Sequence, residues 1–268
     1  KIIAAKNAYH GSTMGALTLM GLEERKKPFE PLIPDVEFIE FNSFQDIRKI
    51  DEKTSCVILE TIQGSAGFIL PTEGYLSSVK KKCKDVGALL ILDEIQTGIG
   101  RTGKLFGFEN FECIPDIIVY GKGLGGGIPI GAFTSSKKLM DELHVNPILG
   151  HITTFGANPV ITAAALQTLK IVLESKIIEN TLSKEKLFRK KLNHKLISEI
   201  RGIGLMLCLI MNDFEIANKL VLEAKNRGLI LFWLLIEKRA VRITPPLTIS
   251  EKEIEEGCDI ILNILDTI

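Results

Sequence analysis

Short apolar runs of strand length alternate with longer amphipathic stretches along the chain, and this alternation constrains the fold more than any other feature. Residues 56–59 and 88–92 are uninterrupted apolar runs, which is typical of strands covered on both faces. Between them, residues 75–84 repeat apolar side chains at helical spacing and carry lysines on the outer side. The alternation predicts βαβ units around a mainly parallel sheet, and therefore an α/β fold.

The remaining elements divide the chain into two parts. Ser250 and Glu253 form a capping-box pattern that predicts a final helix running to the C-terminus. Because short strands mix with helices after residue 175, we expect a large domain over residues 1–174 and a smaller α+β domain over residues 175–268. The other predicted elements are strands over residues 2–5, 117–120, 130–134, 205–211 and 229–235, and helices over residues 159–174 and 183–199.

Composition excludes several classes of function. Lysine and arginine number 33, as do aspartate and glutamate, so the net charge is zero and neither nucleic acid nor a membrane surface is an expected partner. Hydrophobic residues make up 46% of the chain, which is typical of a folded core rather than of disorder. No apolar run approaches the ~20 residues that a membrane-spanning helix requires.

The cysteines, the histidines and the first residue lead to predictions about the cellular compartment, metal binding and the N-terminal region. Five scattered cysteines without a Cys-x-x-Cys pair predict buried thiols in a reducing compartment, which is typical of a cytoplasmic protein. The four histidines form no ligand-spaced cluster, so no metal site is expected. The chain begins at Lys1 with a strand already in progress, which predicts that an N-terminal region is missing.

Two glycine-rich segments resemble nucleotide-binding motifs and fail at the positions that carry the chemistry. Residues 98–104 match GxxxxGK, but Leu105 stands where a Ser or Thr must hold Mg²⁺. Residues 121–126 match GxGxxG, but Pro129 and a strand follow, so no phosphate-capping helix can begin there. We expect these glycines instead to let the backbone turn closely around the lysine among them.

That lysine, Lys122, is the first candidate catalytic residue. It directly follows an apolar strand and has a glycine on each side, so partial desolvation would lower its pKa, as Schiff-base chemistry requires. Asp93 ends another buried strand, where an unpaired carboxylate would be costly and a cationic ring nitrogen would be a natural partner. Ligands gather at the carboxyl ends of strands in open α/β sheets, which predicts that both residues face one site.

The motifs around these two residues closely resemble those of the class III aminotransferases of the ornithine and acetylornithine type, which use pyridoxal phosphate. The resemblance covers nearly the whole chain in family order, and its motifs are specific. It implies the fold of a fold-type I pyridoxal-phosphate-dependent transferase. The segments that carry it are YHG (9–11), ETIQG (60–64), ILDEIQTGIGRTGK (91–104), GKGLGGGIPIG (121–131), TFGANP (154–159) and RITPPL (242–247).

The resemblance implies roles at the cofactor. Lys122 would form the Schiff base and then act as the base that moves the substrate proton. Asp93 would keep the pyridinium nitrogen protonated, so that the ring can act as an electron sink. Gln96 would hydrogen-bond the phenolic oxygen of the ring. Ile95 would pack on one ring face, although an ordinary core position explains it equally well.

Four further positions have implied roles. Tyr9 would stack on the other ring face, with His10 beside it among the cofactor-binding residues. Thr154 would reach the cofactor phosphate of a neighbouring subunit, which implies a homodimer with shared active sites. Arg242 would grip a substrate carboxylate in bidentate geometry. For Glu60, support of the neighbouring site residues and a strand-end salt bridge are equally weighted.

Two positions depart from the family pattern. Ser12 stands where the ornithine and acetylornithine enzymes have a second arginine, and Ser65 stands where they have a glutamate that neutralises the carboxylate-binding arginine. Both changes put the familiar substrates in doubt without touching the cofactor machinery. The family also has a substantial N-terminal region that supplies part of the phosphate and substrate sites.

The resemblance predicts a ping-pong transaminase that moves an amino group from an ω-amine such as acetylornithine, ornithine or 4-aminobutyrate to a 2-oxo acid, with 2-oxoglutarate as the expected acceptor. A mutase or racemase that uses the same lysine is an alternative within the fold. A non-catalytic fragment or dimerisation module is the alternative from a different class.

Overall fold

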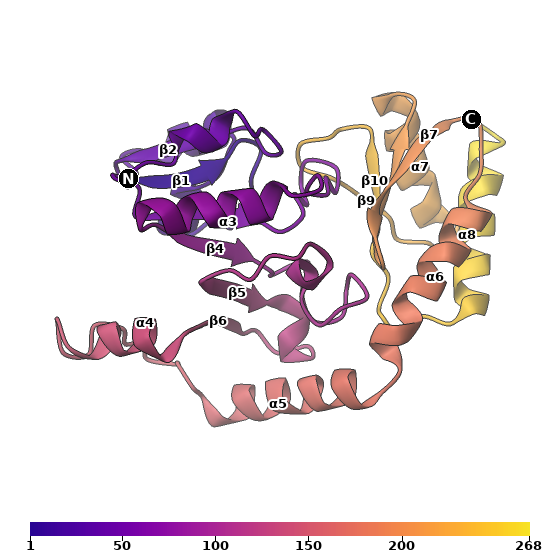
Figure 1. The fold of residues 1–268 in the computed structure, drawn as a ribbon. Helices are drawn as coiled ribbons and strands as arrows, with labels where there is room; N and C mark the ends of the chain where they lie inside the picture. The colour runs from indigo at the N-terminus through magenta and orange to yellow at the C-terminus, as the bar shows by residue number, and fades with distance from the viewer.

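The computed structural model describes residues 1–268 and contains two β-sheets (Figure 1). The larger sheet has six strands in the order β2-β1-β3-β4-β5-β6. The first five run parallel, and β6 pairs antiparallel with β5. The α/β prediction with a mainly parallel sheet is therefore confirmed. The strands are β1 (Ile2–Ala5), β2 (Val36–Ile39), β3 (Cys56–Glu60), β4 (Leu89–Asp93), β5 (Ile117–Gly121) and β6 (Gly131–Ser135).

The smaller sheet has four antiparallel strands in the order β7-β8-β10-β9. Three helices accompany it, and all six side chains of β8 are buried in the cores around it. The elements of this part are α6 (Ile177–Lys191), β7 (Ile197–Ile203), β8 (Met206–Met211), α7 (Phe214–Asn226), β9 (Phe232–Trp233), β10 (Ala240–Ile243) and α8 (Glu251–Leu265). The division of the chain at residue 174 stays a prediction.

The remaining helices surround or extend the larger sheet. In Figure 1, the long helix α5 runs below this sheet and leads into the smaller one, while α4 and the segment after it project away. Short 3₁₀ turns connect other elements. The α-helices are α1 (Met14–Thr18), α2 (Glu23–Lys26), α3 (Tyr75–Val86), α4 (Lys137–Asp141) and α5 (Pro159–Glu174), and the 3₁₀ turns are η1 (Lys27–Phe29), η2 (Asp46–Lys49), η3 (Gly107–Asn110), η4 (Lys122–Gly125) and η5 (Glu142–His144).

Helix α3 shows how the apolar pattern builds the larger core. Its buried side chains recur at helical spacing and pack against strand residues such as Leu90 and Leu92. The helix ends at Gly87, whose positive φ of 80° allows the C-terminal backbone bonds to close without a steric penalty. The buried residues of α3 are Tyr75, Leu76, Val79 and Cys83.

Two sequence-based predictions need correction. The helix predicted over residues 183–199 begins earlier, at Ile177, and ends at Lys191, and residues 197–199 of that range belong to strand β7. The strand predicted over residues 229–235 is reduced to the two residues of β9. Helical spacing of lysines could not reveal β7, because pairing with β8 determines the conformation of this segment.

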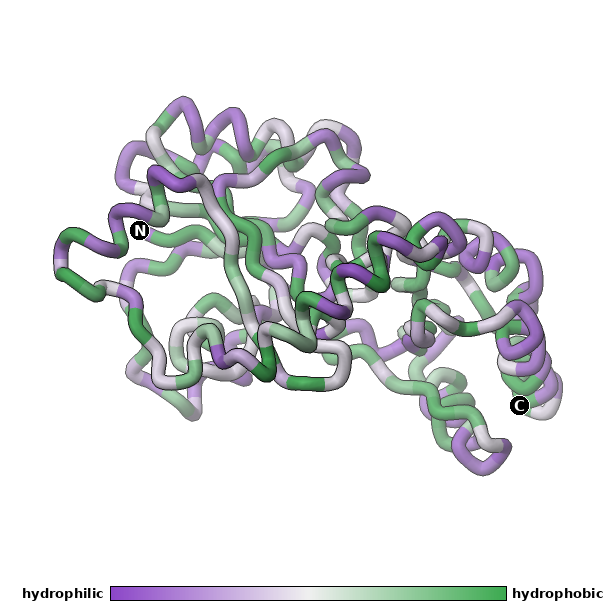
Figure 2. The backbone as a smooth tube through the Cα atoms, turned by 90° about the horizontal axis from the view of Figure 1, so that it is seen from below, coloured by the Kyte–Doolittle hydropathy of each residue, from purple (hydrophilic) through white to green (hydrophobic).

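Other predicted boundaries are confirmed. Helix α5 spans Pro159–Glu174 and begins at Asn158, whose side chain accepts backbone hydrogen bonds from Val160 and Ile161. The capping box of α8 is also present, because Ser250 and Glu253 exchange side-chain and backbone bonds. Figure 2 shows the resulting amphipathic pattern, with hydrophilic and hydrophobic residues alternating within the turns of the helix that ends at the C-terminus.

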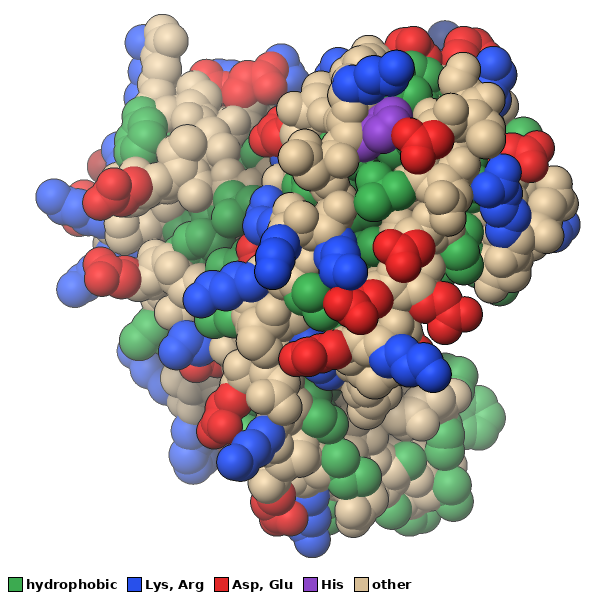
Figure 3. Space-filling model, turned by 90° about the vertical axis from the view of Figure 1, so that its right-hand side faces the viewer, with side chains coloured by type: hydrophobic (Ala, Val, Ile, Leu, Met, Phe, Trp, Pro, Cys, Tyr) green, Lys and Arg blue, Asp and Glu red, His purple; other side chains and the backbone are tan.

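The surface reflects the balanced charge. On the face that Figure 3 shows, lysine and arginine side chains intermingle with aspartate and glutamate. One ion pair, 3.1 Å between Lys191 and Glu255, joins α6 to α8. The apolar stretches of the helices are all too short or too interrupted to cross a bilayer.

The glycine-rich segment 98–104 links the two sheets. Arg101 donates hydrogen bonds from Nη1 to the carbonyl oxygens of Leu205 (3.1 Å) and Pro245 (2.5 Å). Gly204 permits this close approach: its φ is 64°, and a Cβ there would lie 2.6 Å from the carbonyl oxygen of Arg101. The segment thus holds the smaller sheet beside the carboxyl ends of the larger one.

Candidate active site

The carboxyl ends of neighbouring parallel strands bring the candidate residues together. Glu60 ends β3 and Asp93 ends β4, and the two are paired in register. Lys122 follows β5 directly, on the other side of β4. His10 lies a few residues after β1, within hydrogen-bond distance of Asp93. One edge of the sheet therefore carries two carboxylates, an imidazole and an amine.

Asp93 is buried and its two oxygens are held by different donors. One accepts the backbone N–H of Ile95 at 3.0 Å, and the other lies 2.8 Å from Nδ1 of His10. The His10 side chain is also buried, and its Nε2 has no hydrogen-bond partner. A carboxylate pinned in this way keeps its orientation, because neither oxygen can rotate without losing a bond.

Lys122 has an unusual backbone conformation and an unusual environment. Its φ is +41°, in the left-handed region that costs a residue with a side chain about 1–3 kcal/mol. Solvent reaches the side chain through the cavity beside it, yet the surrounding protein desolvates the amine enough to lower its pKa. Asp93 and Glu60 oppose that shift and Arg242 adds to it. A lowered pKa makes the neutral, nucleophilic amine more accessible.

Glu60 supports the site without forming a salt bridge. Its carboxylate accepts backbone N–H groups from Tyr9 at 3.0 Å and Gly64 at 2.9 Å, and it has no ion-pair partner within 4 Å. Burial raises the pKa of Glu60 to about 7, while the nearby His10 works in the opposite direction. The strand-end salt bridge weighed from the sequence is therefore wrong, and Glu60 instead ties the loop after β1 to the loop after β3.

Two cavities meet at Lys122, Gln96 and Arg242. The first has a volume of about 740 Å³ and includes Tyr9 in its wall, and the second, of about 630 Å³, includes Ile95. Five of the residues predicted for the site, with Asp93 and His10 behind them, thus surround one connected region. Each volume is within the range of cofactor and substrate pockets.

Gln96 is positioned partly by a glycine. A Cβ on Gly64 would lie 2.4 Å from Oε1 of Gln96 and 3.3 Å from Oε2 of Glu60. Any larger residue at position 64 would therefore displace the Gln96 side chain. The glycine is visible in the sequence, but only the fold shows that the Gln96 side chain lies where a Cβ on Gly64 would be.

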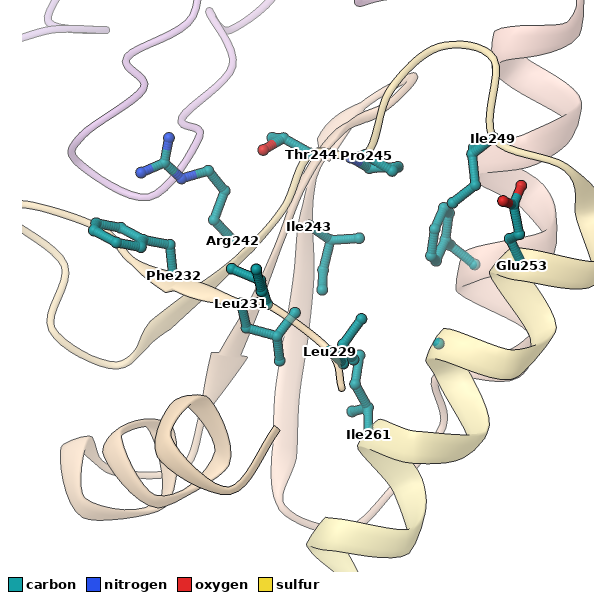
Figure 4. A pocket seen from close by; sticks show the side chains of 13 residues that line it. Leu229, Leu231, Phe232, Arg242, Ile243, Thr244, Pro245, Ile249, Glu253 and Ile261 are labelled. Atoms are coloured by element: carbon teal, nitrogen blue, oxygen red, sulfur yellow. The ribbon is translucent and has the colours of Figure 1, made fainter. Parts of the chain in front are cut away.

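Arg242 projects from β10 into the region where the two sheets meet. In Figure 4, its side chain and that of Phe232 extend away from α8, and Arg242 points toward a loop of the other part of the chain. The guanidinium carbon lies 5.4 Å from the centre of the Phe232 ring, a cation–π contact. Its Nε is buried without a hydrogen-bond partner, and burial lowers the pKa of Arg242. A desolvated, unpaired guanidinium is suited to bind a carboxylate.

A third cavity, of about 420 Å³, lies between β10 and α8 and is mostly apolar (Figure 4). It shares Arg242 and Phe232 with the first cavity, but the other candidate site residues are absent from its wall.

Thr154 is the one predicted site residue that the fold does not bring to this region. It lies in the exposed segment between η5 and α5, and it is absent from the walls of both cavities. Ser12 and Ser65, the two departures from the family pattern, do line the larger cavity. The Tyr9 hydroxyl is 3.5 Å from that of Ser12.

Sequence reasoning missed much of the wall of the larger cavity. These residues carry no catalytic motif and come from the segment after β1 and from the β9 region, so only folding reveals their common location. They are Leu17, Met20, Arg25, Phe29, Phe232, Trp233, Leu234 and Leu235.

A mainly parallel sheet with a lysine and a carboxylate at neighbouring strand ends, beside a small antiparallel sheet, is the arrangement of the fold-type I pyridoxal-phosphate-dependent transferases. The sequence profile of the family described as Aminotransferase class-III matches residues 1–265. The chain belongs to this family.

Individual relatives agree with this assignment. The acetylornithine aminotransferase of Caldanaerobacter subterraneus subsp. tengcongensis is 40% identical over 275 residues, which cover 100% of this chain and 68% of that protein. The crystal structure of the ornithine aminotransferase of Toxoplasma gondii superposes with a TM-score of 0.92 at 30% identity, covering 100% of this chain and 65% of that one. A second structure of that enzyme, with a TM-score of 0.91 at 30% identity and the same coverage, has partial occupancy of PLP at its active site. The chain thus spans about two thirds of the length of these relatives.

Proposed function

We propose that this chain is the main part of a pyridoxal-phosphate-dependent transaminase. The observation that carries the proposal is the placement of Lys122 and Asp93 at the ends of adjacent strands, beside cavities large enough for a cofactor and a substrate. The residues present fit the cofactor. Asp93 is a buried, oriented carboxylate able to pair with a ring nitrogen, and Lys122 offers an amine of lowered pKa for an aldehyde.

When bound, pyridoxal phosphate supplies an aldehyde for the amino group and a ring that accepts the electron pair of the substrate carbon. The carboxylate of Asp93 would hold a proton on the ring nitrogen through its charge, and the His10 and Ile95 contacts keep that carboxylate in place. Ile95 and Tyr9 would confine the ring between them, and Gln96 would donate a hydrogen bond to its phenolic oxygen.

Lys122 handles the proton that moves during transfer. Its Nζ would take the proton from the substrate carbon and return it to the cofactor, and its lowered pKa increases the fraction of the amine that is neutral. Arg242 binds the carboxylate of the substrate and so presents the reacting carbon to this amine. The walls of the cavity, which include Phe232 and Trp233, reduce the access of water.

The proposed donor is an ω-amine of the acetylornithine, ornithine or 4-aminobutyrate type, and the proposed acceptor is 2-oxoglutarate. The relatives named acetylornithine and ornithine aminotransferase support this class of donor. A mutase or racemase would act on the same substrates without consuming an oxo acid, so dependence on 2-oxoglutarate separates the two reactions.

We further propose a cytoplasmic homodimer in which Thr154 serves the cofactor of the partner subunit. The projecting segment around Thr154 exposes large apolar side chains, among them Ile148 at 80%, Ile152 at 74% and Phe155 at 77%. Monomeric proteins rarely expose such a cluster, which supports burial of this segment against a second copy. All five cysteines are free thiols, which supports a reducing compartment.

The proposed function is tested both by trapping the covalent adduct between cofactor and protein and by measuring turnover. Borohydride reduction of the cofactor-loaded protein, followed by peptide mapping, should place the cofactor on Lys122. Lys122→Ala should lose this adduct and nearly all turnover, whereas Lys104→Ala, a control in the preceding glycine-rich segment, should retain both. Recovery of the adduct on another lysine would refute the assignment.

A further inference from the structure

The larger cavity is strongly biased in charge. Its wall contains three cationic side chains, Arg25, Lys122 and Arg242, and neither an aspartate nor a glutamate. The whole chain carries equal numbers of acidic and basic residues, so this excess is local. With Lys122 assigned to the cofactor under the proposed function, two guanidinium groups remain for the substrate.

Arg25 has no partner within the chain. It lies in α2, where Glu23 pairs instead with Lys26 at 3.1 Å, and the Arg25 side chain forms neither an ion pair nor a hydrogen bond. Arg242 is likewise unpaired and makes only the contact with the Phe232 ring. Two free guanidiniums in one cavity repel each other, and an anion at each would relieve that repulsion.

The two guanidiniums come from different parts of the fold. Arg25 belongs to the connection between β1 and β2, and Arg242 belongs to the small antiparallel sheet. Much of the remaining wall is apolar, including Leu17, Met20 and Phe29 from the same connection as Arg25. Apolar side chains beside a cation suit an aliphatic chain that ends in an anionic group.

We propose that Arg25 is a specificity-determining residue that binds the distal carboxylate of the substrate while Arg242 binds the carboxylate next to the reacting carbon. The site thereby selects substrates with an anionic group at each end of an aliphatic chain. The arginine absent at Ser12 is replaced in function by one that lies elsewhere in the sequence. This inference rests on the proposed function, and it adds the residue that recognises the far end of the substrate.

The test compares a diacid with a monoacid of the same chain length. With 2-oxoglutarate and 2-oxopentanoate as acceptors, Arg25→Gln should reduce the preference for the diacid, measured as the ratio of kcat/KM values, by about 10- to 100-fold, as expected for the loss of a charged hydrogen bond. Arg25→Lys should reduce it less. Arg48→Gln, which removes an exposed arginine of η2 that is absent from the cavity wall, should leave the ratio unchanged.

A binding measurement provides a readout without turnover. Calorimetry on the cofactor-loaded protein should show that glutarate binds more tightly than pentanoate and that Arg25→Gln removes most of the difference. An unchanged preference in Arg25→Gln by both methods would overturn the inference, as would a loss of cofactor affinity with the diacid preference intact. Either result would leave the proposed transaminase standing if the Lys122 adduct and turnover persist, whereas the absence of that adduct would refute the proposed function itself.

Discussion

The buried carboxylate of Glu60 should make the folded protein less stable as the pH rises. Burial raises the pKa of Glu60 from 4.5 to about 7 in the folded chain. The folded state therefore holds this proton more tightly than the unfolded state, so the contribution to stability is largest below pH 4.5 and is lost as the pH rises to about 7. Between pH 5 and pH 8, these two pKa values correspond to a loss of about 2.5 kcal/mol in the free energy of unfolding.

Glu60→Gln removes this titration while keeping the shape of the side chain. The N–H groups of Tyr9 and Gly64 each donate to a different oxygen of Glu60. The amide of Gln keeps an oxygen for one of these N–H groups but presents its NH₂ to the other N–H group, and this loss of a hydrogen bond costs about 1–3 kcal/mol at every pH. The variant should accordingly be less stable than the wild type at pH 5 and should recover about 2.5 kcal/mol relative to it at pH 8.

Urea unfolding of the cofactor-free protein, followed by circular dichroism at both pH values, measures this difference. Glu73→Gln is the matched control, because Glu73 is exposed and forms no ion pair. Its difference from the wild type should stay constant with pH. If wild type and Glu60→Gln lose stability in parallel between pH 5 and pH 8, Glu60 does not hold its proton in the folded state and the reasoning fails.

Two further predictions concern catalysis and assembly. Asp93→Asn keeps the shape at the end of β4 but removes the charge proposed to pair with the ring nitrogen. Breaking a buried pair costs ~3–5 kcal/mol, so kcat should fall by about two to four orders of magnitude. A variant within twofold of the wild type contradicts that role. Mixing inactive Lys122→Ala with Thr154→Ala should restore about a quarter of the wild-type activity after subunit exchange, because about half of the dimers are mixed and each mixed dimer keeps one of its two sites intact. No recovery despite proven exchange would place the whole site within one chain.

The strands and the position of the site follow from local sequence. Uninterrupted apolar runs predicted β3, β4 and β5, because such runs are typical of strands covered on both faces. Asp93 and Lys122 were recognisable because each is a charged residue directly after such a run. The sheet order then brings them together, as expected for the carboxyl ends of adjacent parallel strands.

The sequence failed where the conformation depends on a distant partner. The range 183–199 looked helical throughout, yet its last residues form β7 because β8 offers the backbone hydrogen bonds. The same limit applies to Glu60, whose alternatives stayed open until its bonds to Tyr9 and Gly64 were seen.

The wall of the larger cavity was decided by tertiary structure alone. Arg25 and Phe232 are more than 200 residues apart and carry no motif, but they line one cavity because the smaller sheet packs beside the strand ends of the larger one. Local pattern determines which segments become strands and helices, since hydrophobic periodicity acts over a few residues. Specificity depends on which surfaces those elements bring face to face, and that is a property of packing between segments that the sequence separates.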